Sequence, residues 1–258
     1  SRGLGDVYKR QFLLTLQLDS SLPSQIPSFW ESSFQSAAEA DQCWKTIGFN
    51  LKCVQVTSGP LLGKVTMERL GSMVLISFQS NQSLLIQGER NRDYIAFCVE
   101  QTNEIDMHRV WGEKIQPHSI HGFSSRLSEA FFQTTPGSLI SIALFPLARL
   151  TAIAELESMG SIMETLEASN TAVLPDQQFK QIKTLLQPNN ASKKTNARSN
   201  SDLFEALLVE CFSQEGKHQL HAPSLTHRTE LIRELIEFSF KQSTSALSLH
   251  DICNTIFT

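Results

Sequence analysis

Residues 64–99, KVTMERLGSMVLISFQSNQSLLIQGERNRDYIAFCV, decide the fold that we expect for this chain. The stretch contains short runs rich in β-branched and aromatic residues, and turn residues fall between them or at their edges. Short strands with turn signals at this spacing predict an antiparallel β-barrel or β-sandwich. We expect strands over residues 64–68, 73–78, 84–87 and 94–99, and a further one over 138–144.

The strand pattern extends outward from this stretch, from Trp44 to about Leu150. Ile47, Phe49 and Leu51 alternate with polar or small neighbours, which predicts another strand. No regular alternation of strands with helices occurs in this half, so we expect an all-β module.

The hydrophobic period changes from 2 to 3.6 after Pro146. Apolar residues at helical spacing predict helices around residues 153–166, 179–186 and 203–212, and the polar segment 189–201 is typical of a connector. The fold class that we expect is therefore α+β, with an antiparallel cupin-like β-barrel or sandwich followed by an α-helical region.

Composition restricts the class of protein. Hydrophobic residues make up 41% of the 258 residues and charged residues 19%, which is typical of a globular chain and excludes a disordered one. The net charge of −4 excludes a strongly basic nucleic-acid coat but not a small basic reading surface. Five scattered cysteines without a C-x-x-C pair predict reduced thiols and a cytoplasmic location. No apolar run is long enough for a membrane-spanning helix.

The sharpest local signal lies near the C-terminal end. Ser248 is placed to cap a helix that begins at residue 249, and Asp251 is placed to bond back to the backbone of Ser248. Leu247 and Ile252 have the spacing of a hydrophobic staple. A preceding helix is predicted over residues 226–241, so the two form a helical hairpin. Such hairpins occur in DNA readers and in many proteins that bind no DNA.

These residues carry a resemblance. The strings RTELIRELIEFSF (228–240) and ALSLHDICNTIF (246–257) resemble the first two helices of the DNA-binding domain of AraC-type bacterial transcription regulators. The resemblance implies a helix-turn-helix scaffold formed by Ser248, Leu249, Asp251, Ile252, Cys253 and Ile256. Phe257 departs from the family pattern, because many members have glycine at that turn position.

A looser match lies in the N-terminal half. Trp44, the segment 55–63 (QVTSGPLLG) and Trp111 with Gly112 are similar to the β-rich, cupin-like sensory half of some AraC-type regulators. The resemblance implies a one-component regulator that senses an effector through this half and binds specific DNA sequences through the other. It also implies a homodimer.

We expect four regions. Residues 1–11 are interpreted as a sequencing-adapter scar, because DVYKRQ (6–11) reads back as a transposase end sequence. Residues 12–150 are the sensory module, 151–222 a helical linker and dimerisation region, and 223–258 the start of a truncated DNA-binding domain. The recognition helix is then absent, so DNA is expected as a partner of the full-length protein only.

Candidate binding residues come from the aromatic side chains of the β half. Phe78, Tyr94, Phe97 and Trp111 are candidates to line an effector pocket, although aromatic residues in strands are more often simple core.

No catalytic, metal or cofactor site is expected. His108, His118 and His121 do not form the H-x-H pair of metal-binding cupins, and His118 and His121 should lie on opposite faces of a strand. Two alternatives stay open at this point. One is a cupin-type metal enzyme, and the other is a truncated sensor that dimerises with full regulators and antagonises them.

Overall fold

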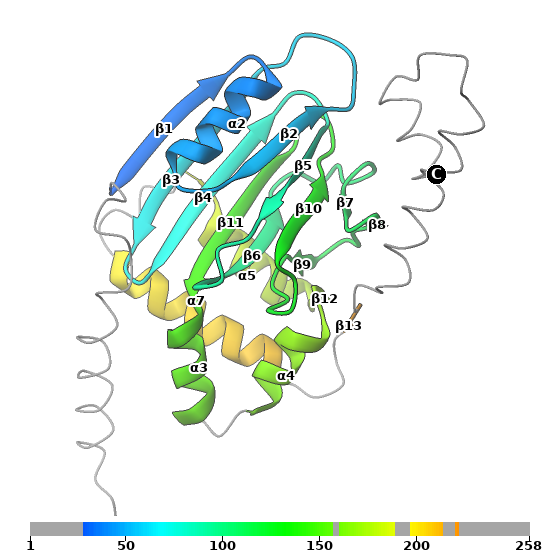
Figure 1. The fold of residues 1–258 in the computed structure, drawn as a ribbon. Helices are drawn as coiled ribbons and strands as arrows, with labels where there is room; N and C mark the ends of the chain where they lie inside the picture. Colours follow the sequence, from blue (N-terminus) through cyan, green and yellow to red (C-terminus); the bar gives the residue numbers. More distant parts are fainter. Residues whose placement is uncertain (1–27, 157–159, 189–196, 214–219, 222–258) are drawn as a thin grey trace, which may run out of the picture.

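The computed structural model describes residues 28–156, 160–188, 197–213 and 220–221, which form two antiparallel sheets and a layer of helices (Figure 1). The large sheet contains, in spatial order, β1 (Phe29–Phe34), β3 (Gly63–Leu70), β4 (Met73–Ser80), β11 (Leu139–Pro146), β6 (Tyr94–Glu100), β9 (Ser119–His121), β12 (Thr171–Val173) and β13 (Leu220–His221). The small sheet contains β2 (Leu51–Gln55), β5 (Leu84–Glu89), β10 (Glu129–Gln133), β7 (Arg109–Val110) and β8 (Glu113–Lys114).

The centre of the large sheet is buried on both faces. Strand β11 pairs with both β4 and β6, so that Ile142 lies opposite Ile76 on one side and Cys98 on the other. These three side chains face the small sheet and belong to its core. The alternate residues, such as Leu75 and Phe97, belong to a second core on the other face. Burial on both faces explains why β4 and β6 are nearly continuous hydrophobic runs.

The helices cover the second face of the large sheet. They are α3 (Leu147–Leu156), α4 (Gly160–Ala168), α5 (Asp176–Leu186) and α7 (Ala197–Ser213). Ile182, Phe204 and Leu208 are buried in one cluster with Phe97 and Phe145 of the sheet. The molecule therefore has three layers: small sheet, large sheet and helices.

Helix α2 (Ala37–Thr46) connects β1 of the large sheet to β2 of the small one. Its first turn is fixed by a reciprocal cap, because Ser36 Oγ accepts from the Glu39 backbone at 3.2 Å and Glu39 Oε2 accepts from the Gln35 backbone at 2.8 Å. Trp44 near its end stacks on Phe78 with ring centroids 5.4 Å apart, which anchors the helix to the inner core.

The α+β class and the five strands that the sequence predicts are confirmed, but the cupin-like closed barrel is not. Strand β1 pairs with β3 and β2 pairs with β5, and α2 runs between the two edges, so the strands form a sandwich of two separate sheets. The strand predicted to begin at Ile47 is also wrong. Ile47 ends α2, Gly48 adopts a left-handed φ of 91°, and the strand starts at Leu51.

The predicted helix-turn-helix scaffold, from Ser248 to Ile256, lies outside the described residues, as does the helix predicted over 226–241. The helices predicted around 179–186 and 203–212 coincide with α5 and α7, whereas the single helix predicted around 153–166 corresponds to two helices, α3 and α4. In the described part of the chain, no helix has the length and apolar character needed to cross a membrane.

Candidate ligand-binding cavity

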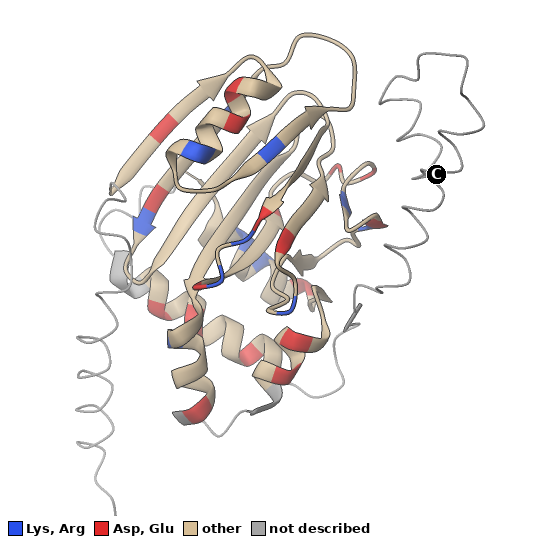
Figure 2. Ribbon diagram, in the orientation of Figure 1, with Lys and Arg blue, Asp and Glu red and all other residues tan. Residues whose placement is uncertain are grey.

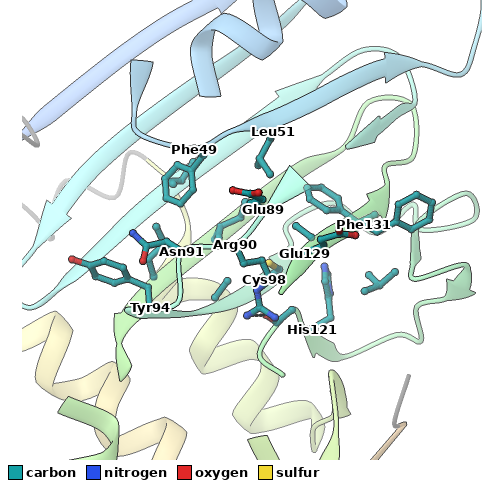
Figure 3. A pocket seen from close by; sticks show the side chains of 18 of the residues that line it. Phe49, Leu51, Glu89, Arg90, Asn91, Tyr94, Cys98, His121, Glu129 and Phe131 are labelled. Atoms are coloured by element: carbon teal, nitrogen blue, oxygen red, sulfur yellow. Dashed lines mark hydrogen bonds between the residues drawn. The ribbon is translucent and has the colours of Figure 1, made fainter. Parts of the chain in front are cut away.

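A cavity lies between the two sheets at the end where β5 leads into β6 (Figure 3). Its volume is about 90 Å³. Its wall is mostly apolar and combines both sheets with the end of α2. The main apolar and aromatic contributors are Trp44, Phe49, Leu51, Ile76, Tyr94, Ala96, Val110, Trp111, Ala130, Phe131, Phe132, Ile142 and Leu144.

Small side chains create this space. Ala96 on β6 and Ala130 on β10 come from opposing sheets, and Gly122 follows β9 at the same wall. Strand alternation directs Ala96 inward together with Tyr94 and Cys98. Larger residues at these positions would bring the sheets' side chains into contact, because protein interiors otherwise pack without voids.

Three buried polar atoms in the wall have no hydrogen-bond partner among the residues that the structure describes: the hydroxyl of Tyr94, Nδ1 of His121 and Nε1 of Trp44. Tyr94 is 8% exposed to solvent and His121 is 2% exposed. A buried polar group without a partner costs about 1–3 kcal/mol of stability. Such groups beside an apolar hollow are the arrangement that binds and orients a small molecule.

A buried chain of ionisable groups leads away from His121. Its ring lies 5.0 Å from the ring of His108, and Nδ1 of His108 lies 3.4 Å from Oε2 of Glu100. The other oxygen of Glu100 accepts three hydrogen bonds, from the backbone N–H groups of Thr102 and Leu139 and from the Thr102 hydroxyl. Burial, and in second place the neighbouring His108, lower the pKa of His121 well below its usual value. His121 is therefore neutral at pH 7.

Arg90 lies at the rim of the cavity and connects the loop between β5 and β6 to the loop between β9 and β10. Its guanidinium donates from Nη1 to the Ser124 carbonyl at 2.6 Å and from Nη2 to the Gly122 carbonyl at 2.7 Å. Burial lowers the pKa of Arg90, and the nearby Cys98 works in the opposite direction. Burial raises the pKa of the Cys98 thiol to about 12, so Cys98 is a neutral thiol and not a nucleophile.

The structure separates the four aromatic candidates. Tyr94 and Trp111 line the cavity. Phe78 is buried beside it in the inner core, stacked between Phe34 and Trp44. Phe97 lies on the other face of the large sheet, against Phe123, Phe204 and Phe212 of the helical side. Tyr94 and Phe97 are three residues apart in one strand, and this odd spacing alone indicates opposite faces.

The two histidines lie on different sides, but they do not share a strand as predicted, because His118 is in the turn before β9 with a φ of 60°. His118 is on the outside, stacked on Phe179, with Nε2 at 3.6 Å from Asp176, and His121 is inside. Neither His121 nor Arg90 is among the binding residues predicted from the sequence. Among the residues that the structure describes, no group of three or more His, Cys, Asp or Glu side chains is arranged to hold a metal ion.

Comparison with known proteins gives structural similarity only. No protein-family model matches the chain, and no curated protein matches it significantly. The AraC-like transcriptional activator CuxR aligns with 88% of this chain and 84% of its own, with 11% identity and a TM-score of 0.47. ToxT from Vibrio cholerae aligns with 90% of this chain and 72% of its own, with 10% identity and a TM-score of 0.23.

Proposed function

We propose that the described part of the chain is a sensory module that binds a small, largely apolar organic effector between its two sheets. The main observation behind the proposal is an apolar cavity whose wall contains buried polar atoms without a partner in the described part of the chain, among them the Tyr94 hydroxyl and His121 Nδ1. An effector that supplies a partner to each atom would gain hydrogen bonds that water does not provide in a site this apolar. No reaction is assigned to the module.

The layered fold offers a route from the cavity to the helices. Strand β6 places Ala96 and Cys98 in the cavity wall, while Ile95 and Phe97 of the same strand pack in the core beneath the helices. Helix α5 packs against β6 and β11. A ligand that binds one arrangement of this strand better than another would shift the population of helix positions on the far face.

We propose further that the effector signal controls transcription in the cytoplasm. This part rests on the resemblance of residues 228–257 to the opening of an AraC-type DNA-binding domain, and it includes binding to DNA by the full-length protein as a homodimer. An electrophoretic mobility assay with the complete gene product, with and without effector, tests it. Absence of any sequence-specific DNA binding would contradict the regulatory role.

The cavity itself is tested by filling it. We expect Ala96→Leu to weaken binding of the uncharged fluorescent probe N-phenyl-1-naphthylamine at least tenfold, because the added side chain occupies the probe's space. The control is Ala168→Leu, which adds the same atoms at an exposed position of α4. Fluorescence titration of both variants and the unaltered chain gives the three dissociation constants, and circular dichroism checks the fold. Equal affinity in all three would contradict a ligand site at this place.

A further inference from the structure

A second, polar cleft opens beside the inter-sheet cavity. It lies between the loop that joins β5 to β6 and the loop that joins β9 to β10, and its volume is about 300 Å³. Figure 2 shows basic segments in both loops at this end of the sandwich, with acidic segments beside them. Arg90, Asn91 and Tyr94 line the cleft and the cavity alike, so the two spaces are neighbours across these residues.

The cleft carries positive charge. Arg90, Arg92 and Arg126 line it, together with serine residues of the second loop, and no Asp or Glu side chain is among its lining residues. Arg90 has both Nη atoms engaged by backbone carbonyls, so it serves mainly to hold the loops together. Arg92 and Arg126 are exposed, and the pair of Arg126 with Glu167 at 3.2 Å is exposed on both sides. An exposed ion pair is weak and can be exchanged for a ligand anion.

The acidic residues nearest to the cleft line the cavity beside it. Glu89 and Glu129 lie opposite one another on β5 and β10, at the cavity rim. Neither glutamate lines the polar cleft, although both line the cavity. The cavity is therefore mostly apolar with two carboxylates at its rim, and the arginine side chains without a lining carboxylate lie in the cleft.

We propose that the effector is an amphipathic organic anion. Its apolar body occupies the inter-sheet cavity, and its carboxylate, sulfonate or phosphate head lies in the polar cleft against Arg92 and Arg126. Guanidinium groups suit this role, because their planar donors match two oxygens of such a head at once. This inference rests on the proposed function, since it names the ligand class of the same site.

Two probes with one body test the charge preference. The anionic probe 8-anilino-1-naphthalenesulfonate is N-phenyl-1-naphthylamine with an added sulfonate. We expect the full chain to bind the anionic probe more tightly, with an affinity that falls as salt is raised. The double variant Arg92→Gln/Arg126→Gln should weaken its binding about tenfold or more and leave the uncharged probe unchanged.

The matched control removes two positive charges elsewhere. Lys64→Gln/Lys114→Gln alters two lysines outside the cleft, each paired with a carboxylate of its own. This variant should bind both probes as the unaltered chain does, and thermal unfolding verifies that each variant folds. If the single substitution Arg126→Glu weakens binding of the anionic probe more than Arg126→Gln does, the effect is due to charge and not to lost packing.

The outcomes separate the inference from the function on which it rests. If the uncharged probe binds and the anionic probe binds no better, or the arginine variant weakens both equally, the anion preference is overturned and the cavity remains a site. Tighter binding of a cationic probe of similar body would overturn it too. If neither probe binds the unaltered chain, the proposed function fails together with the inference.

Discussion

His121 is a buried base without a charged partner, and its protonation state is linked to folding. Its pKa is lowered in the folded chain, while in the unfolded chain it is expected at the ordinary value of about 6.5. Above pH 6.5 the residue is neutral in both states and has no effect on stability. Below that pH, His121 binds a proton in the unfolded chain but stays neutral in the folded chain. The free energy of unfolding therefore decreases as the pH falls.

We therefore predict that His121→Phe reduces the pH dependence of stability below pH 6.5. The unaltered chain should lose up to about 1.4 kcal/mol per pH unit more than the variant, which is the linkage slope for one proton. Urea unfolding at a series of pH values from 8 to 5 measures this difference, and pH 7–8 provides the internal control, where the two slopes should agree. Parallel stability curves across the whole range would show that His121 does not carry the titration.

At the scale of elements, sequence patterns predicted those parts of the fold in which local periodicity and packing agree. The runs 73–78 and 94–99 became β4 and β6 because both faces of the large sheet are covered. The two-residue strands β7 and β8 and the three-residue strands β9 and β12 are too short to show a period, and tertiary pairing forms them. His121 and Gly122 reach the cavity on such a strand and its end, so their place in the cavity wall could not be predicted from the sequence pattern.

Helix α2 was missed although Ser36 and Glu39 have the spacing of a capping box. We predict that Ser36→Ala lowers the free energy of unfolding by about 1 kcal/mol, because the Glu39 backbone N–H loses its acceptor. The matched control is Ser33→Ala at an exposed position of β1. Chemical denaturation of both variants compares them directly. An equal, small effect for the two serines would mean that the cap does not stabilise α2.

At the scale of the whole molecule, the predicted border between residues 150 and 151 runs through a shared hydrophobic core. Phe97, Phe123 and Phe145 precede that border, and the side chains packed on them, such as Phe204 and Phe212, follow it. Aromatic side chains bury more surface than any others, so this contact is a large share of the core. The sheets and the described helices should therefore unfold together, as one cooperative unit.

A shortened chain tests this unity. Residues 1–150 alone would expose the outer face of β6 and β11 that α4, α5 and α7 cover, and we predict loss of the cooperative thermal transition and of the near-ultraviolet dichroism of its aromatic residues. A chain of residues 1–221 keeps every described element and should retain both signals. If residues 1–150 melt cooperatively at the temperature of the longer chain, the sandwich is independent of the helices. The proposed coupling between the cavity and the helices through β6 would then have no physical basis. A ligand can shift the population of helix positions only if the packing of the helices on that strand contributes to the stability of the bound state.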